Sequence, residues 1–296
     1  MGKKQKTFEG IVGVIMFLLI VCCILPFVLL IMSSLSDETS LLKYGYTLWP
    51  KEFSTAAYEY LLKQGSTILR AYGISIVLTV TGTALGLMTT ALLAWPISRA
   101  DYPYRKILSF LVIVTLLFNG GLVPTYFVYT SILKVKNTFW GLLLPNLLLS
   151  GFNVMIMRSF FANTIPMAVI ESAKIDGAGE FTIFFRIVLP LSMPIMAMIG
   201  LMIGINYWND WYNGMIYITD TSLFSIQNLL NRMLSDIQFL SSNAAVSGQA
   251  GAVLASIPST TVRMAIAVAG TLPILIIYPF FQKYFQKGIT LGAVKG

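Results

Sequence analysis

Long apolar runs separated by short polar segments dominate the sequence. Six stretches are each apolar enough to form a helix of about 20 residues, the length that crosses the hydrocarbon core of a bilayer. Their approximate bounds are 11–32, 69–95, 107–130, 139–160, 190–215 and 258–281. Backbone N–H and C=O groups find no water in lipid, so spanning segments of this kind must be helical. The pattern therefore predicts an all-α membrane protein with six transmembrane helices.

The first apolar run has two interpretations. It follows Lys3, Lys4 and Lys6, just as the apolar core of a secretory signal peptide follows basic residues. As a helix, however, the run is roughly 33 Å long, which is enough to cross the membrane. It also lacks a small-residue cleavage site where one is expected. We therefore expect a retained first transmembrane helix.

Composition supports a membrane protein. The 296 residues are 56% hydrophobic and 11% charged, whereas soluble domains carry about 25% charged residues. The formal net charge of +8 would suit a nucleic-acid partner, but the basic residues are scattered between apolar runs and fit membrane topology better. The chain has no histidine, and its two cysteines, Cys22 and Cys23, are adjacent. We expect neither a metal site nor a disulfide framework.

Basic residues also indicate orientation, because cytoplasmic loops of membrane proteins carry an excess of Lys and Arg. Six spans put both termini on one side. With the termini inside, the inner segments hold twelve of the 20 basic residues, the outer segments hold seven, and Arg263 lies within the sixth span. The outer seven are Lys43, Lys51, Lys63, Arg70, Lys134, Lys136 and Arg232. This predicts cytoplasmic termini, long outer loops at about 33–68 and 216–257, and a long inner loop.

Small and polar residues inside the spans predict contacts between helices. Gly82 and Gly86, like Gly200 and Gly204, have the small-xxx-small spacing that lets helices approach closely. Asn119, Asn146 and Asn153 are polar positions within spans. Hydrogen bonding between helices is one role for these asparagines, and contact with a transported substrate is the other.

The inner loop at about 163–190 carries the most specific pattern in the sequence. Ser172 and Ala173 have small side chains that would let another protein approach closely. Gly177 can end a first helix in a left-handed conformation. An apolar face on a second helix is predicted by residues at helical spacing, namely Phe181, Phe184, Phe185 and Val188. We expect an ordered helix–turn–helix on the cytoplasmic side.

This loop resembles the EAA loop of ABC-importer permeases, whose pattern is roughly E-A-A-x-x-D-G-A, followed further on by I-x-L-P. The matching residues are Glu171, Ala173, Asp176, Gly177, Ala178, Ile187, Leu189 and Pro190. Ser172 stands where Ala is usual, and it is similarly small.

Two further segments resemble the carbohydrate-uptake branch of these permeases. Residues 282–296 resemble the C-terminal tail of the maltose-permease G-subunit type, and residues 119–126 resemble a subgroup that imports complex oligosaccharides. The resemblance covers nearly the whole chain. It implies a single permease domain over 1–296, with the type I ABC importer (MetI-like) fold, in the cell membrane.

The resemblance also implies a function and a set of partners. Two permease subunits, here expected to be a heterodimer, would dock their EAA loops on ATP-binding subunits, while an extracytoplasmic solute-binding protein delivers a sugar or oligosaccharide. The ATPase-coupling residues would then be Glu171, Ser172, Ala173, Asp176, Gly177 and Ala178. The chain has no G-x-x-x-x-G-K-[ST] run. We therefore expect ATP to bind to the partner subunits, no cofactor in this chain, and a transport subunit that is not an enzyme.

Aromatic and polar residues near the outer ends of the spans are candidates for the substrate path. Trp208, Trp211 and Tyr212 have the spacing of one helical face, and their rings could pack against sugars. The alternative is an aromatic belt at the membrane interface. Arg263 could reach outward to that interface or face an acidic sugar, whereas Asp210 is expected to be solvated. The full candidate set is Trp208, Asn209, Trp211, Tyr212, Arg263, Asn119 and Asn153.

Three other classes of protein remain open at this point. An ABC permease for another solute, such as an amino acid or peptide, would share the EAA loop but not the carbohydrate-type tail. A secondary transporter would need paired inverted repeats with broken helices, which the sequence does not show. A membrane-embedded enzyme would need a catalytic constellation. Glu171 and Asp176 are poor candidates, because they lie roughly 140° apart on a continuous helix.

Overall fold

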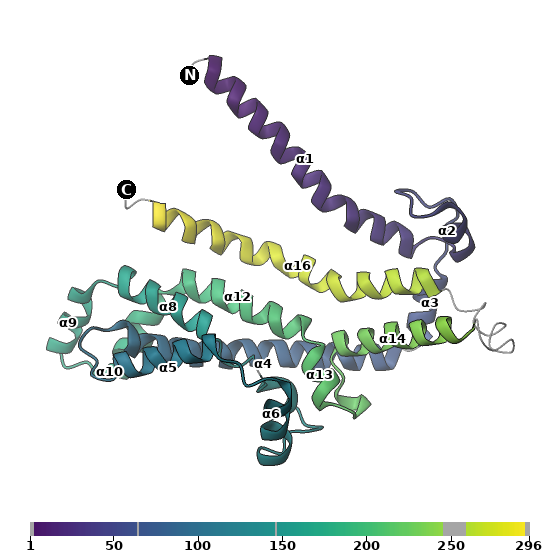
Figure 1. Cartoon of the computed structure of the whole chain (residues 1–296). Coiled ribbons are helices and arrows are strands. Elements are labelled where there is room, and N and C mark those ends of the chain that lie inside the picture. Colours follow the sequence, from purple (N-terminus) through teal and green to yellow (C-terminus); the bar gives the residue numbers. More distant parts are fainter. Residues whose placement is uncertain (1–2, 64, 146, 245–258, 294–296) are drawn as a thin grey trace. The chain divides into compact units, whose positions relative to one another are not determined.

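The computed structural model describes residues 3–63, 65–145, 147–244 and 259–293 (Figure 1). Within these residues the secondary structure is helical, apart from one isolated β-bridge between Ser36 and Phe53. The predicted all-α fold class is confirmed. Asn146, most of the second half of the predicted outer loop at 216–257, and the last three residues of the predicted tail lie outside the described residues.

The chain divides into two compact units. Unit 1 comprises Met1–Ile68 and Leu230–Pro273, and unit 2 comprises Leu69–Leu229 and Ile274–Gly296. The boundaries fall within three helices, namely α4 (Gly65–Ser98), α14 (Ile226–Ala244) and α16 (Ser259–Ala293). The predicted single permease domain stays a prediction, because a division by contacts does not test it.

Unit 1 begins with a helix that buries almost nothing. In α1 (Lys3–Ser34), the most apolar window of the segment Phe8–Ser34 has no buried residue, although this segment is the most hydrophobic of the candidate spans. A helix that is apolar on every side and exposed within its own chain needs lipid or another subunit around it. This finding agrees with the expected membrane span at 11–32.

Two short helices follow α1 within the predicted first outer loop. Asp37 caps α2 (Glu38–Tyr44), because its carboxylate accepts hydrogen bonds from the backbone N–H groups of Thr39 and Ser40. These bonds, led by one from the Thr39 side chain, lower the pKa of Asp37. The next helix is α3 (Ala56–Lys63). The predicted first outer loop at about 33–68 therefore contains two helices.

In unit 2, glycines mark a close approach between α4 and α12 (Met193–Asn209). A Cβ atom added at Gly82 would lie 2.4 Å from the Tyr207 ring, and one added at Gly86 would lie 3.3 Å from Ile203. A Cβ atom added at Gly204 would lie 3.2 Å from the Thr83 side chain. The small residues therefore let the two helices approach, as their spacing predicted.

The other elements of unit 2 are shorter. They are α5 (Arg105–Leu117), α6 (Leu122–Phe127), η1 (Val128–Ile132), α7 (Trp140–Leu143), α8 (Gly151–Thr164), α9 (Met167–Ile175), α10 (Glu180–Ile183), η2 (Phe184–Val188), α11 (Leu189–Leu191), α13 (Tyr212–Tyr217) and η3 (Thr221–Leu223). Helix α5 packs against α8, and α8 packs against α12 (Figure 1).

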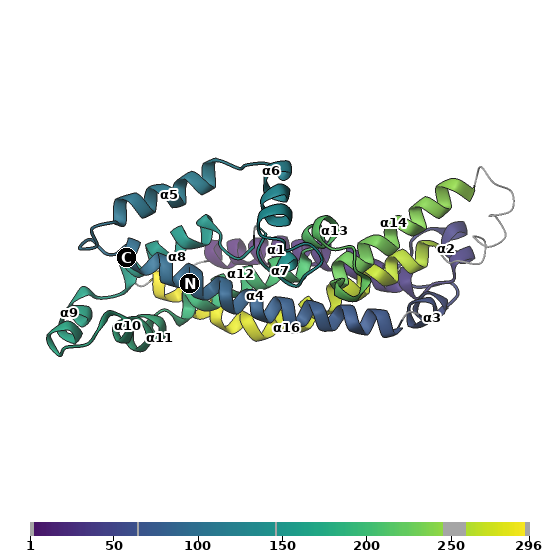
Figure 2. The ribbon, with the colours of Figure 1, turned by 90° about the horizontal axis from the view of Figure 1, so that it is seen from below.

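Only some of the six predicted spans are continuous helices in the structure. Among the described residues, three helical segments are long and apolar enough to cross a membrane, namely Phe8–Ser34, Gly65–Ser98 and Thr260–Ile277. The number rises to six if each of three bent helix pairs counts as one span. The third predicted span, 107–130, is bent by 115° between α5 and α6 (Figure 2). The fourth, 139–160, is interrupted because α7 ends at Leu143 and α8 begins only at Gly151.

Candidate functional site

The predicted helix–turn–helix of the inner loop is present as α9, a glycine turn and α10. Gly177 has φ of +79°, in the left-handed region that favours glycine. Its N–H donates to the Lys174 carbonyl at 3.0 Å, and the Ala178 N–H donates to the Ala173 carbonyl at 2.9 Å. Together these two bonds form a Schellman motif, which satisfies the last carbonyls of α9. Gly177 therefore ends the helix in the manner that the sequence predicted.

Most of the α9 surface is open to a partner. Glu171, Ser172, Asp176 and Gly177 are exposed, and Ala173 and Ala178 are half-buried. Ile170 is the one buried residue of α9. Beside these polar groups two large apolar side chains are exposed, Ile175 by 85% and Phe181 by 76%. The loop thus presents small, charged and apolar groups on an ordered backbone.

The predicted apolar face of the second helix was partly wrong. Phe184 and Val188 are buried, but Phe181 and Phe185 are exposed. The physical reason is that residues Phe184–Val188 form a π-helix, which changes the angular spacing between residues. Ile183, which the helical spacing did not select, is buried instead.

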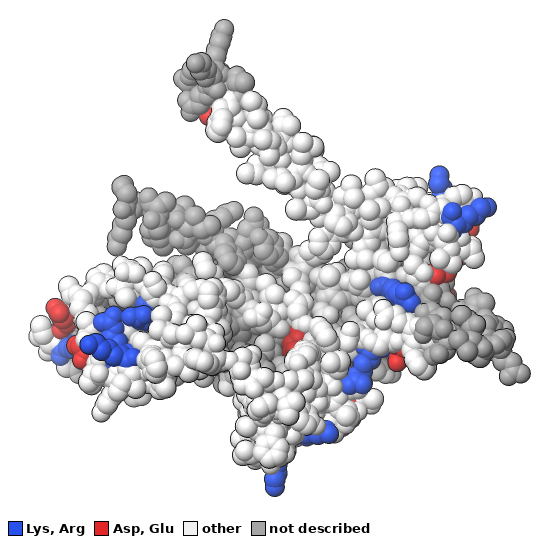
Figure 3. Space-filling model, in the orientation of Figure 1, with Lys and Arg blue, Asp and Glu red and all other residues white. Residues whose placement is uncertain are grey.

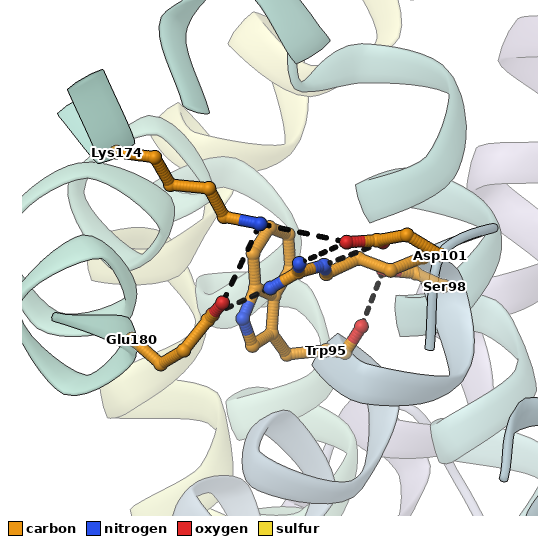
Figure 4. A network of polar contacts seen from close by, with 6 residues as sticks. Trp95, Ser98, Asp101, Lys174 and Glu180 are labelled. Atoms are coloured by element: carbon orange, nitrogen blue, oxygen red, sulfur yellow. Dashed lines mark hydrogen bonds and ion pairs between the residues drawn. The ribbon is translucent and has the colours of Figure 1, made fainter. Parts of the chain in front are cut away.

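Four charged side chains connect this loop to the end of α4 (Figure 4). The Arg99 guanidinium donates from Nε to the Asp101 carboxylate at 3.0 Å, from Nη2 to the same carboxylate, and from Nη1 to the Glu180 carboxylate. Lys174 Nζ lies 3.4 Å from Asp101 Oδ2 and 3.6 Å from Glu180 Oε1. The result is a closed ring of alternating charges. Lys174 precedes the Gly177 turn, and Glu180 follows it.

Arg99 is the most enclosed member of this ring. Its side chain is 11% exposed, and its Cζ atom lies 5.5 Å from the centre of the Trp95 ring, within cation–π range. Trp95 is buried and meets Phe161 of α8 edge-to-face. Hydrogen bonds to Asp101 and then Glu180 raise the pKa of Arg99, so this side chain stays charged. The hydrogen bonds from Arg99 lower the pKa of Asp101 to about 2.

Charged side chains gather at the end of unit 2 that carries α9 and α10, whereas the neighbouring helix flanks show few charges (Figure 3). A cavity of about 580 Å³ lies beside the charged ring, lined by residues that include Trp95, Tyr102 and Phe181. This distribution is typical of the end of a membrane protein that faces water.

Sequence reasoning missed the part played by Arg99 and Asp101. Arg99 was counted only as a topology signal, although the sequence does place alternating charges directly after the apolar run of α4. Nothing local indicates that they meet Lys174 and Glu180, which lie more than 70 residues further along the chain.

The aromatic candidates for the substrate path do not share one helical face. Helix α12 ends at Asn209, and Asp210 has an extended backbone with ψ of 102°. This break separates buried Trp208 from Trp211 and Tyr212, which are exposed on the other side of it. Asn209 is also exposed. Trp211 and Tyr212 lie edge-to-face, with ring centres 5.9 Å apart.

Asp210 is buried, so the expectation that it is solvated was wrong. Its Oδ1 atom accepts a hydrogen bond from the Asn213 N–H at 3.1 Å, and the Asn213 side chain donates to the Pro145 carbonyl at 3.0 Å. The Tyr207 hydroxyl donates to the Leu143 carbonyl at 2.8 Å. These bonds join the α12–α13 break to the interruption between α7 and α8, because side chains at the first break satisfy backbone carbonyls at the second.

The remaining candidates lie in different surroundings. Asn119 is exposed in the α5–α6 break, where its side chain accepts a hydrogen bond from the Gly121 N–H at 2.9 Å. Asn153 is buried in α8, and Arg263 is half-buried near the start of α16 in unit 1. Trp208 lines a cavity of about 400 Å³ with residues of α4, α12 and α16, including Thr79, Thr83 and Ile274. The lining of this cavity is almost entirely apolar, which does not suit a hydroxyl-rich ligand.

Apolar helices with broken spans, together with an ordered charged loop at one end, define the class of protein as a multi-pass membrane protein.

Comparison with known proteins narrows this class. The chain is 36% identical to the polygalacturonan/rhamnogalacturonan transport system permease protein YtcP of Bacillus subtilis, over 99% of this chain and 100% of that protein. It is 39% identical to Protein LplC of the same organism, over 92% of this chain and 90% of that one. It is also 29% identical to the arabinooligosaccharides transport system permease protein AraQ of Bacillus subtilis, over 92% and 90%. No family model matches the chain.

A solved structure shares the fold. It belongs to a bacterial ABC transporter involved in the import of the acidic polysaccharide alginate. It matches 96% of this chain and 99% of its own, with a TM-score of 0.79 and 24% identity. The chain belongs to the family of ABC transport system permeases that contains these oligosaccharide permeases.

Proposed function

We propose that the chain is one permease subunit of an ABC importer that takes up sugars or oligosaccharides, with energy supplied by a separate ATPase. The observation that carries the proposal is the α9–Gly177–α10 hairpin. It is ordered by its own cap, yet Ile175 and Phe181 stay exposed on it. Exposed apolar groups on an ordered element are typical of a docking surface. Glu171, Ser172, Ala173, Asp176, Gly177 and Ala178 are the residues that we assign to ATPase coupling.

The substrate assignment is supported by relatives. The names of two of them specify polygalacturonan or rhamnogalacturonan and arabinooligosaccharides. We propose an oligosaccharide substrate, delivered by an extracytoplasmic solute-binding protein to a pair of permease subunits. Trp211, Tyr212 and Asn209 are our first candidates for its path, because their side chains are exposed and lie close together along the chain at the α12–α13 break. Trp208, Asn119, Asn153 and Arg263 remain in the candidate set, with Arg263 as the cation that would favour an acidic sugar.

The orientation belongs to the same proposal. Cytoplasmic termini place the α9–α10 hairpin inside the cell, where ATP is available to a partner subunit. They place α2 and α3 outside the cell. We expect no bound cofactor in this chain itself.

Uptake measurements test the function. A strain lacking the chain is supplied with labelled galacturonate-based, arabinose-based and neutral glucose-based oligosaccharides. The proposal predicts loss of uptake of at least one of them, and its return when the wild-type chain is expressed. A docking variant, Ile175→Lys, should fail to restore uptake, whereas Leu42→Lys on α2 should restore it, because both side chains are exposed and neither change affects a core. Unchanged oligosaccharide uptake, with a loss of amino-acid or peptide uptake, would contradict the proposal.

A further inference from the structure

The tip of the α9–α10 hairpin has little apolar attachment to the rest of unit 2. Ile170 anchors the middle of α9, and Ile183 anchors the end of α10. Between these two anchors Ile175 and Phe181 are exposed. Packing therefore fixes the two ends of the hairpin but not the turn at Gly177.

Charges hold the turn instead. Lys174 lies on the α9 side of the turn and Glu180 on the α10 side, and both bind groups in the segment that follows α4. Arg99 bonds two carboxylates at once, one on its own segment and one on the hairpin. A guanidinium can do this because its N–H donors are fixed in a planar fork.

The ring is anchored to the body of unit 2 through Arg99. Its guanidinium lies over the buried Trp95 ring, and Trp95 meets Phe161 of α8. Two residues before Arg99, the Ile97 carbonyl accepts a hydrogen bond from Nε of Arg158 of α8 at 3.1 Å. The end of α4 is thus fixed to α8, and the hairpin is fixed to the end of α4.

We propose that Arg99 is a positioning residue, which ties the tip of the α9–α10 hairpin to α4 so that a displacement of the hairpin moves α4 with it. Helix α4 passes this displacement to α12, because Gly82 and Gly86 bring the two helices into contact. The inference rests on the proposed function for the source of the displacement, which is the ATPase. The geometric tie itself depends only on this chain.

The ring of charges is not expected to contribute much to the free energy of unfolding. Asp101 and Glu180 side chains are 46% and 57% exposed, and Lys174 is 38% exposed. Exposed ion pairs contribute about 0–1 kcal/mol each. The Arg99 side chain is 11% exposed, so Glu180→Gln, which changes an exposed partner and leaves Arg99 in place, is the variant that should leave the fold intact and change the position of the hairpin.

A distance measurement tests the tie in this chain alone. Cys22 and Cys23 are replaced, and spin labels are placed at Leu85 on α4 and Ile175 on α9, both exposed positions. The protein is reconstituted in lipid nanodiscs without partners. We expect Arg99→Gln and Glu180→Gln to broaden the distribution of label-to-label distances, and Arg99→Lys to broaden it less. The matched control, Arg186→Gln, removes an exposed cation of η2 that is outside the ring and should leave the distribution unchanged.

High salt gives the same test without mutation. Because the Debye length falls from about 10 Å at 0.1 M salt to about 3 Å at 1 M, the wild-type distribution should broaden with salt, and the Arg99→Gln distribution should not. If the label-to-label distances of Arg99→Gln were distributed as in the wild type, the inference would be overturned. Equal broadening in Arg186→Gln would also overturn it, since the effect would then follow general destabilisation.

A second readout connects the tie with transport. In the assembled importer, Arg99→Gln should hydrolyse ATP but lose uptake per ATP by roughly fivefold or more, the lower end of common coupling strengths. Normal uptake per ATP in Arg99→Gln would overturn the inference. The proposed function has its own test, which it fails if Ile175→Lys restores uptake in the deletion strain. The distance measurement in the isolated chain does not depend on that result.

Discussion

At the scale of single residues, Gly177 has the most constrained backbone in the hairpin. An ideal Cβ atom at this position would meet no other atom within 4 Å, so only the positive φ opposes a side chain. A left-handed conformation costs an L-residue about 1–2 kcal/mol, and asparagine tolerates it better than a β-branched residue does.

We predict that Gly177→Val opens the Schellman motif and that Gly177→Asn largely keeps it. Hydrogen exchange at the Ala178 amide, which bonds the Ala173 carbonyl, measures this directly. Exchange should be fastest in the valine variant. Equal protection in the wild type and Gly177→Val would show that the left-handed turn is not required.

The charged ring makes a prediction about pH. Arg99 lowers the pKa of Asp101 to about 2, from an ordinary value of 3.8, with a smaller contribution from Lys174. A lowered pKa means that the stabilisation is present above the ordinary value and is lost as the pH falls through about 2. The hydrogen bond from Arg99 also lowers the pKa of Glu180. Both carboxylates of the ring should therefore stay charged between about pH 5 and 8, above the ordinary pKa values of Asp and Glu.

The Leu85–Ile175 label distances should accordingly be the same at pH 5.5 and pH 8, while salt changes them. A shift over this pH range that disappears in Arg99→Gln would contradict our assignment of the charges in the ring.

At the scale of elements, the α4–α12 contact depends on a missing side chain. Adding a methyl group at Gly82 would force it into the Tyr207 ring, whose hydroxyl bonds the Leu143 carbonyl and cannot move freely. Overpacking of this kind costs about 1–3 kcal/mol. The same change at Gly73, also on α4, meets nothing within 4 Å.

We predict a lower thermal unfolding midpoint for Gly82→Ala than for Gly73→Ala, measured in the same detergent. Equal midpoints would show that α4 and α12 do not approach as closely as the structure indicates.

Helix α16 begins with a cap from a distant part of unit 1. The Glu38 carboxylate accepts hydrogen bonds from the N–H groups of Thr260 and Thr261 and from the Thr261 hydroxyl, at 2.8–2.9 Å. Loss of a helix cap costs about 0.5–2 kcal/mol. Glu38→Ala should thus lower the unfolding midpoint, with Glu52→Ala, an exposed glutamate of the same loop, as the control. If the two variants unfold together, Glu38 does not stabilise α16.

The sequence was informative where structure follows from local pattern. The runs at 11–32, 69–95 and 258–281 correspond to long helices because each is a continuous apolar stretch, and the Gly177 turn follows from the one residue suited to positive φ. Pro145 indicates a kink in the fourth span, but the full breaks near Asn119, Pro145 and Asp210 were not predicted. They are stable because groups far apart in the chain meet there, such as Asn213 and the Pro145 carbonyl. The π-helix that exposes Phe181 and Phe185 has no local signal either.

At the scale of the whole molecule, the account requires α2 and the α9–α10 hairpin to face opposite sides of the membrane. Single cysteines at Leu42 and Ile175, both well exposed, can be tested in a background without Cys22 and Cys23. In intact cells, a thiol reagent that cannot cross the membrane should label position 42 but reach position 175 only after the cells are opened. The reverse pattern would invert the proposed topology.

The central claim is that the α9–α10 hairpin is where a separate ATPase engages this permease. A photoreactive amino acid at Ile175 tests it most directly, with the same group at Leu42 as the control. After irradiation of living cells, mass spectrometry identifies the cross-linked partner. The account predicts an ATP-binding subunit at position 175 and none at position 42. Contact of position 175 with lipid or other proteins only, in cells that take up the substrate normally, would contradict it.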